Sequence, residues 1–355
     1  MRNLLAMRLD NLGDVLMTGP ALRAIREALP QARITLMASP GGAQAAPLLP
    51  WIDQVLSERV VWQDVSGRLT FDPEREGRLV ARLSEKRFDA SVIFTSFNQT
   101  PHAAAYLCYL AAIPLRLGAS KERGRAVLTN ELSGAPDSLH QVERNLRLVE
   151  SVGFTAASRH LSITLPSEAR QRCRIILEER GVHPRQPFLL LNPWTSCQAR
   201  TYPWQRFGEA ARLLVAETGW RVVVTGVERD RLRSRELVGG IGRAAVDMTG
   251  RTSFPELACL VDASSLVLTN NTSVMHLADA TATPAVITFS GTELESQWRP
   301  RRGPAVLLRH PTSCSPCYAF TCPFNLECLD IPAREVAEAA LQLLGSGRPS
   351  QVRSQ

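Results

Sequence analysis

The chain opens with Asn3-Leu4-Leu5-Ala6-Met7, an apolar run too short for a helix, and continues through a polar turn, Asp10-Asn11-Leu12-Gly13-Asp14. After the turn, apolar residues recur with helical spacing at Leu16, Leu22, Ile25 and Leu29. A strand, a tight turn and a helix in this order predict the first unit of a parallel β/α/β sheet.

Two series of such strand and helix signals run along the chain. The first continues with short β-like runs at residues 33–37, 90–94 and 115–117. The second has its β-like runs at residues 188–191, 221–225, 266–269, 285–289 and 305–308. Because the intervening residues 152–185 are polar, helical and interrupted by prolines, we expect a domain boundary there. The predicted parts are an N-terminal domain 1–165, a C-terminal domain 166–331, a helix 332–346 and a flexible tail 347–355.

The composition is that of a globular enzyme. A chain of 355 residues is long enough for two domains, and 45% apolar against 21% charged residues exclude intrinsic disorder. The longest weakly polar stretch, residues 103–113, is shorter than the ~20 residues of a membrane-spanning helix. The amino terminus lacks the apolar core of a signal peptide. We therefore expect a cytoplasmic protein.

The charge and the missing motifs narrow the choice of partners. A formal net charge of +7 fits an anionic partner such as a phosphate, an acidic glycolipid or a nucleic acid. No glycine-rich dinucleotide fingerprint follows the first strand of either series, and no P-loop sequence occurs, so dehydrogenases and P-loop proteins lose their main support. Nucleic-acid motifs and aromatic-basic platforms are missing as well, so we expect no nucleic-acid partner.

Asp14 is the first candidate functional residue. Gly13 permits the tight turn after the first strand, and Asp14 then places a carboxylate at a helix amino terminus. In Rossmann-like domains this position belongs to the ligand-binding edge of the sheet. Asp14 fits two roles equally well, that of an N-cap and that of a general base.

Two loops of the second series carry groups suited to a nucleotide. Thr195, Ser196 and Arg200 follow its first strand, and a guanidinium can grip diphosphate oxygens in a bidentate way. Gly226 and Glu228 follow its second strand and set a carboxylate where it can bind a ribose diol. Each loop on its own is a weak signal.

A third loop precedes a helix of small and apolar residues. It reads Asn270-Asn271-Thr272-Ser273-Val274-Met275-His276. Small hydroxyl and amide side chains at a helix start leave backbone N–H groups open to a pyrophosphate, and the helix dipole favours the negative charge. Ordinary N-capping by Asn271 or Thr272, and a structural role for His276, explain the same residues.

Taken together, these stretches resemble the ADP-heptose lipopolysaccharide heptosyltransferases, glycosyltransferase family nine, over nearly the whole chain. Residues 8–22 are similar to the opening signature of that family, and residues 195–207 match its donor-phosphate loop, with Arg200 where the family has Lys. Residues 269–278 resemble its Asn-Asp-Ser-Gly-Pro-Met-His block, with Asn271 in place of Asp. The resemblance implies the GT-B fold, with two Rossmann-like β/α/β domains facing a central cleft.

The resemblance also implies an activity. An inverting glycosyltransferase would move heptose from ADP-heptose to an acceptor hydroxyl, on the inner core of lipopolysaccharide. Asp14 would be the base and Arg200 would stabilise the leaving diphosphate, with no metal or cofactor at the reaction centre. The N-terminal domain would bind the acceptor, and the C-terminal domain would bind the donor. The residues expected to contact the donor are Thr195, Ser196, Arg200, Gly226, Glu228, Asn271, Thr272, Ser273 and His276.

Two other functions stay open. One is a related transferase that uses another nucleotide sugar or a protein or small-molecule acceptor, and Asn271 keeps it open. The other is a non-catalytic sugar-nucleotide-binding homologue, against which Asp14 and Arg200 argue. In the family the acceptor is an anionic glycolipid, and the basic loop with Lys121, Arg123 and Arg125 either meets it or is a solvated loop. Binding through the acceptor implies peripheral contact with the inner membrane surface.

A cysteine cluster near the end of the chain stands apart from these loops. Four of the eight cysteines have the spacing C-x2-C-x4-C-x5-C, namely Cys314, Cys317, Cys322 and Cys328. In a cytoplasmic chain this spacing favours a metal or free thiols over disulfides. Four thiolates would hold a structural zinc or iron ion.

Overall fold

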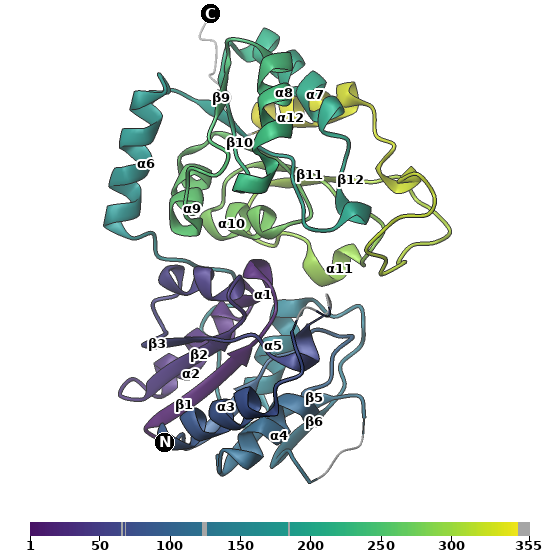
Figure 1. Cartoon of the computed structure of the whole chain (residues 1–355). Helices are drawn as coiled ribbons and strands as arrows, with labels where there is room; N and C mark the ends of the chain where they lie inside the picture. The colour runs from purple at the N-terminus through teal and green to yellow at the C-terminus, as the bar shows by residue number, and fades with distance from the viewer. Residues whose placement is uncertain (65–66, 68, 123–125, 184, 347–355) are drawn as a thin grey trace, which may run out of the picture. The chain divides into compact units, whose positions relative to one another are not determined.

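The computed structural model describes residues 1–64, 67, 69–122, 126–183 and 185–346, and the chain divides into two compact units (Figure 1). The first unit is Met1–Thr164, and the second begins at Leu165. Each unit contains a parallel six-stranded sheet with helical crossovers. The predicted α/β fold with two Rossmann-like domains is confirmed.

The sheet of the first unit has the order β3-β2-β1-β4-β5-β6. Its strands are β1 (Asn3–Arg8), β2 (Arg33–Ala38), β3 (Gln54–Ser57), β4 (Ala90–Ile93), β5 (Leu115–Ser120) and β6 (Asn130–Ser133). Its helices are α1 (Leu12–Leu16), α2 (Gly19–Ala28), η1 (Gly42–Leu48), η2 (Val61–Gln63), α3 (Pro73–Glu85), α4 (His102–Leu110) and α5 (Gln141–Glu150). Strand β1 lies between β2 and β4 and is buried on both faces, which explains its continuous apolar run.

The sheet of the second unit has the order β12-β11-β10-β7-β8-β9. Its strands are β7 (Phe188–Asn192), β8 (Arg221–Val224), β9 (Ala245–Asp247), β10 (Leu266–Asn270), β11 (Ala285–Thr288) and β12 (Ala305–Leu308). Its helices are α6 (Ser167–Glu179), η3 (Gln198–Arg200), α7 (Trp204–Thr218), η4 (Glu228–Asp230), α8 (Arg231–Ile241), α9 (Phe254–Ala263), α10 (Ser273–Thr281), α11 (Glu295–Trp298), η5 (Glu327–Leu329) and α12 (Ala333–Ser346).

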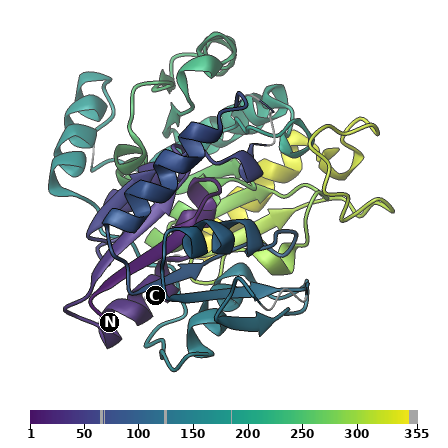
Figure 2. The ribbon, with the colours of Figure 1, turned by 60° about the horizontal axis from the view of Figure 1, so that its bottom comes forward.

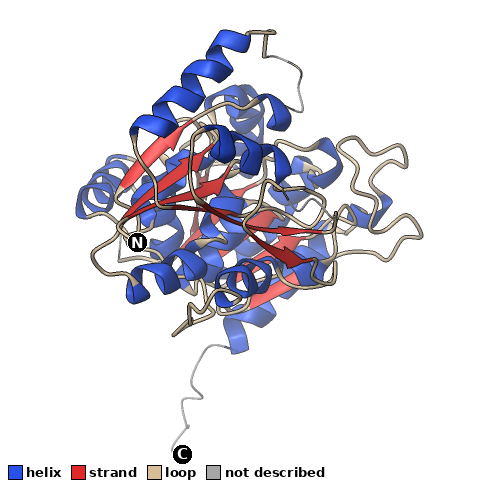
Figure 3. Cartoon of the chain, turned by 90° about the horizontal axis from the view of Figure 1, so that it is seen from below, coloured by secondary structure: helices blue, strands red, loops and turns tan. Residues whose placement is uncertain are grey.

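Helices (blue) surround the strands (red) in Figure 3. In the second unit α7 packs against both α8 and α12, and α9 packs against both α6 and α10. In the first unit α2 packs against α5, and α3 packs against α4. Within the described ranges, no helix is long and apolar enough to span a bilayer.

Three strands were not expected from the sequence. Strands β3 and β6 are mostly exposed or half-buried, so they lack the apolar run that marks a buried strand. Strand β9 has only three residues. The single helix expected after the first turn is also two helices, α1 and α2. The break comes just before Gly19 and Pro20, where the proline starts α2 in its favoured first turn.

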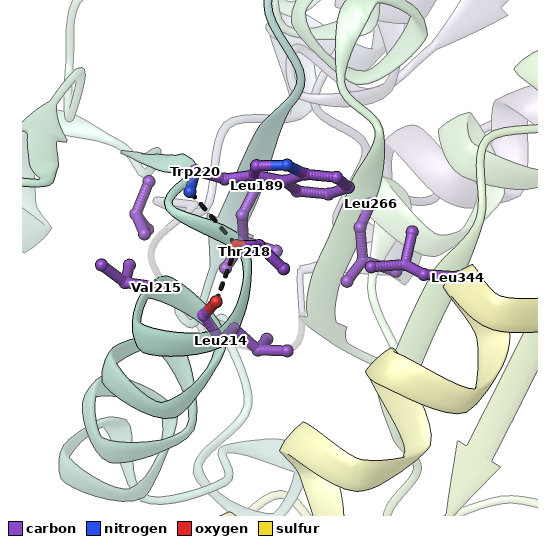
Figure 4. Close-up of a pocket in the computed structure, with 8 residues that line it drawn as sticks. Leu189, Leu214, Val215, Thr218, Trp220, Leu266 and Leu344 are labelled. Carbon is purple, nitrogen blue, oxygen red and sulfur yellow. Dashed lines mark hydrogen bonds between the residues drawn. The ribbon is translucent and has the colours of Figure 1, made fainter.

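A small apolar pocket lies at the amino ends of strands β7, β8 and β10 (Figure 4). It is lined by Leu189, Leu214, Val215, Thr218, Trp220, Val222, Leu266 and Leu344. The Thr218 hydroxyl already donates to the Leu214 carbonyl and accepts from the Trp220 N–H. Parallel sheets bind ligands at the opposite, carboxyl ends of their strands. The pocket is therefore a packing feature of the core, and the candidate site must be sought at the other edge.

Candidate functional site

Asp14 is the third residue of α1 and is not its N-cap. The N-cap is Asn11, whose backbone N–H donates to Asp14 Oδ2 at 3.1 Å. The Asp14 side chain is 16% exposed. The cap role therefore belongs to Asn11, and Asp14 presents a partly open carboxylate after β1.

Two further charged residues, Arg8 and Asp10, lie near this carboxylate. Arg8, at the end of β1, has a fully buried side chain, and its Nη2 lies 2.8 Å from Asp14 Oδ1. Its Nε lies 3.0 Å from Asp10 Oδ2. Burial raises the pKa of Asp10, the Arg8 charge opposes that rise, and the Asp14 charge adds to it. The sequence showed Arg8 and Asp10 beside Asp14, but not that one guanidinium contacts both carboxylates.

The three nucleotide loops of the second unit follow β7, β8 and β10, which are neighbours in the sheet. Two buried amides join these loops. Asn192 Nδ2 donates to Thr225 Oγ1 at 3.0 Å, and Asn270 Nδ2 donates to the Pro193 carbonyl at 2.8 Å. The Asn270 Oδ1 also accepts the Tyr202 N–H at 2.9 Å. These contacts give the loops a fixed arrangement that the sequence did not reveal.

In the loop after β7, the hydroxyl groups and the Arg200 guanidinium have different surroundings. Thr195 Oγ1 accepts the Cys197 N–H at 3.0 Å and lies 2.7 Å from Thr201 Oγ1, while Ser196 is exposed. Arg200 Nη2 lies 2.8 Å from Glu293 Oε1, in the loop after β11, and Arg200 Nε has no hydrogen-bond partner. The guanidinium therefore already binds a carboxylate, an anion that can stand in for a phosphate.

Gly226 and Glu228 lie in the loop after β8. A Cβ added to Gly226 would stand 2.4 Å from the Trp194 ring, so the glycine is required by packing. The Glu228 carboxylate is 68% exposed and pairs with Arg231. Close packing explains Gly226 without any ligand, whereas Glu228 remains accessible.

The loop after β10 leads directly into α10. Asn271 is buried, and its Oδ1 accepts the Ser290 N–H at 3.3 Å, while its Nδ2 has no partner. Thr272 caps α10 by accepting the Val274 N–H at 3.3 Å, and Ser273 is half-buried. An unpartnered buried N–H at this edge is a group that a ligand oxygen would satisfy.

His276 lies further along α10. It is buried, and its ring centroid is 6.3 Å from that of Trp298 at an interplanar angle of 53°. Trp298 Nε1 is a second buried N–H without a hydrogen-bond partner. His276 thus lies beside an aromatic ring, and no sequence pattern indicated Trp298 as part of this site.

The cysteine segment between β12 and α12 extends to one side of its unit (yellow-green in Figures 1 and 2). The Cys322 N–H donates to Gln198 Oε1 at 2.8 Å, and the Cys317 N–H donates to the Gly291 carbonyl at 3.1 Å. Cys328 Sγ accepts the Gly291 N–H at 3.2 Å. The segment therefore braces the loops after β7 and β11.

The four cysteines are free thiols in this arrangement. Cys328 is buried and Cys314 and Cys322 are half-buried, while Cys317 is exposed. Over the described ranges, no group of three or more His, Cys, Asp or Glu side chains is arranged to hold a metal ion. A metal here would require the thiols to move together, so zinc or iron at the cluster stays a prediction.

The basic loop predicted for the acceptor is described only in part. Lys121 Nζ lies 2.5 Å from Asp137 Oδ1, with both side chains about half exposed. Arg123 and Arg125 lie outside the described residues. The contact of this loop with an anionic acceptor stays a prediction.

Two parallel Rossmann-type sheets in one chain, with candidate polar groups at the carboxyl ends of the strands, are typical of the GT-B fold. The chain belongs to glycosyltransferase family 9 (heptosyltransferase), whose family model matches residues 77–327. The protein is therefore a glycosyltransferase.

Similar proteins agree with this assignment. The chain is 26% identical to lipopolysaccharide heptosyltransferase 2 of Salmonella typhimurium over 290 residues, which cover 78% of this chain and 79% of that protein. Among solved structures, a family 9 glycosyltransferase from Veillonella parvula superimposes with a TM-score of 0.79 at 20% identity, covering 97% of both chains. ADP-heptose lps heptosyltransferase II of E. coli superimposes with a TM-score of 0.75 at 20% identity, covering 98% of this chain and 99% of that chain.

Proposed function

We propose that the protein transfers heptose from ADP-heptose, with inversion, to a hydroxyl of an anionic glycolipid, the inner core of lipopolysaccharide. The observation that carries this proposal is the set of groups at the carboxyl edge of the second sheet. Arg200, the unpartnered Asn271 amide and the start of α10 lie on the loops that follow β7 and β10, which are adjacent strands. They supply a cation, a buried donor and a helix dipole for one diphosphate sugar.

The reaction needs one base and one stabilised leaving group. Asp14 takes the proton of the acceptor hydroxyl, whose oxygen forms a bond to the anomeric carbon as the bond to the β-phosphate oxygen breaks. ADP leaves with that electron pair, and Arg200 and the N–H groups at the start of α10 stabilise its charge. Transfer requires Asp14 of the first unit to meet the donor held by the second, and closure would exclude competing water.

Asp14→Asn tests the base. The amide keeps the size of the side chain and loses its proton affinity, so transfer should fall about 10²–10⁴-fold while donor binding is retained. Glu27→Gln, which removes a partly exposed carboxylate on α2, is the matched control and should leave the rate unchanged. A rate near that of the wild type would remove Asp14 from this role.

A thermal-shift screen of nucleotide sugars tests the donor. A ligand at 100 times its Kd adds about 2.7 kcal/mol of stability, and ADP-heptose should give the largest shift. A larger shift with a nucleotide sugar of another base or sugar would identify the related transferase that Asn271 leaves open. Binding of ADP-heptose without transfer or hydrolysis would identify a non-catalytic homologue.

The acceptor and the location of the enzyme belong to the same proposal. An acceptor on the inner membrane places the enzyme in the cytoplasm, in peripheral contact with the membrane surface. The basic loop with Lys121, Arg123 and Arg125 supplies positive charge for the anionic glycolipid. Sedimentation with vesicles that contain the glycolipid should depend on salt, because exposed charges are screened. Co-sedimentation with vesicles that lack the glycolipid would contradict binding through the acceptor.

We also propose a structural zinc or iron ion on Cys314, Cys317, Cys322 and Cys328, with no part in the transfer. Its support is the thiol chemistry and the N–H groups directed at sulfur. Cys322 Sγ accepts the N–H groups of Phe324 and Leu326, each at 3.4 Å. Elemental analysis of anaerobically purified protein should find about one metal ion per chain. Protein that is active and free of zinc and iron would overturn this part.

A further inference from the structure

The buried guanidinium of Arg8 contacts more than the predicted base. Its Nη2 donates to Asp14 Oδ1 at 2.8 Å and to Ser96 Oγ at 2.7 Å, and its Nε lies 3.0 Å from Asp10 Oδ2. The Nη1 group makes no hydrogen bond within the described residues. Burying a cation with a free N–H group costs stability. The ion pairs with the two carboxylates offset the cost of burying the Arg8 guanidinium.

We infer that Arg8 and Asp10 are positioning residues for Asp14: Arg8 fixes the orientation of the carboxylate, and Asp10 balances the guanidinium charge so that Asp14 can accept a proton. This inference deepens the proposed function and rests on Asp14 being the base.

The charge balance around Arg8 gives the role of Asp10. With both carboxylates ionised the three side chains carry a net charge of −1, which becomes zero when Asp14 takes the acceptor proton. Without the Asp10 charge, the same step would go from zero to +1 beside a fully buried guanidinium. A buried site opposes the creation of net charge, so Asp10 favours proton uptake by Asp14.

Neighbouring groups hold Asp10 in place for this role. Gln99 Nε2 donates to Asp10 Oδ1 at 2.5 Å, and Gln99 Oε1 accepts the Ser96 N–H at 2.9 Å. Ser96 and Gln99 follow β4, the strand that pairs with β1. The loops after two adjacent strands therefore form one network around the carboxylates, which keeps the base preorganised.

Two neutral groups also contact this network. Ser39, after β2, donates its hydroxyl to the Asp10 carbonyl, and Asn11 donates its N–H to Asp14. A further cation is Arg144 on α5. Burial lowers its pKa, Asp137 opposes that change, and the charge of Arg8 contributes to the lowering. Since Arg144 adds positive charge, the balancing carboxylate of Asp10 matters more.

Asp10→Asn is the central test, read by the pH dependence of transfer from ADP-heptose. The rate plateau should fall about tenfold, and the acid limb of the profile should move about one pH unit lower, because Asp14 becomes a weaker base. The KM for ADP-heptose should be unchanged, and Glu27→Gln should match the wild type. A fall in rate with an unmoved acid limb, or an unchanged rate, would overturn the role of Asp10.

Arg8→Lys tests the orientation. Lysine keeps the charge and loses the planar fork that reaches both carboxylates. We expect kcat to fall about tenfold or more with the KM for ADP-heptose unchanged. A wild-type kcat would overturn the positioning by Arg8, and Asp10→Asn still decides the inference should Arg8→Lys fail to fold.

A readout without turnover separates this inference from the proposed function. In protein carrying ¹³C at the aspartate carboxyls, the Asp14 signal is assigned by its absence in Asp14→Asn. Its titration midpoint should move about one pH unit lower in Asp10→Asn than in the wild type. That shift in a protein without transferase activity of any kind would contradict only the proposed function. Active enzyme with an unmoved midpoint would contradict only the inference.

Discussion

Arg200 shares its guanidinium with a carboxylate of its own unit. Glu293 lies 2.8 Å away and is mostly buried, with 15% of its side chain exposed. A diphosphate that binds Arg200 must compete with this carboxylate or draw the guanidinium away from it. Glu293 should therefore weaken the predicted contact of Arg200 with a nucleotide. Its distance in sequence from Arg200 hid this pairing.

Replacing Glu293 changes that competition. Glu293→Gln removes the competing charge, so ADP should bind several-fold more tightly, whereas Arg200→Gln should weaken ADP binding about tenfold or more. Isothermal titration calorimetry with ADP measures both changes. Weaker binding in Glu293→Gln would mean that Glu293 contacts the donor itself.

At the scale of elements, Trp194 and Gly226 connect the loops after β7 and β8. Trp194 is buried, donates from Nε1 to Ser234 Oγ at 2.9 Å, and has the Arg233 guanidinium 4.7 Å from its ring centroid. The sequence suggested Gly226 as a nucleotide contact, and the structure explains it by close approach to this ring. Because Gly226 has no side chain, the Trp194 ring fits beside it and can bond to Ser234, which holds α8 against the loop that carries Arg200.

Gly226→Ala should therefore destabilise the second unit. The added methyl overlaps the Trp194 ring, which must shift and lose its bond to Ser234, at a cost of about 1–3 kcal/mol. Gly239→Ala is the matched control, because a Cβ there meets nothing within 4 Å and favours helix α8. Urea unfolding measures both variants. Equal stability of Gly226→Ala and the wild type would show that Trp194 moves freely.

At the scale of the whole molecule, the two units carry different parts of the predicted chemistry. The first carries Asp14 with Arg8 and Asp10, and the second carries Arg200, Asn271 and the start of α10. Each unit has a core of its own, built on its own sheet. A nucleotide without acceptor should therefore bind to the second unit.

Hydrogen exchange of the full chain with and without ADP tests this division. Protection should be confined to the loops after β7, β8, β10 and β11, because a bound nucleotide suppresses local opening where it makes contacts. The loop after β1, around Asp14, should exchange as it does without ADP. Protection at β1 and α1 without protection of the β7 loop would show that the nucleotide binds the first unit and would contradict this division.

The apolar runs and polar turns of the sequence determined the α/β fold, nine of the twelve strands and the loops in which chemistry was expected, because buried parallel strands need continuous apolar residues. Edge strands such as β3 and β6 lack that requirement. Only the tertiary structure decided which side chains meet: Arg8 with two carboxylates, Arg200 with Glu293, and Gly226 with Trp194. These contacts join residues brought together by the order and register of the strands, which local sequence patterns do not encode.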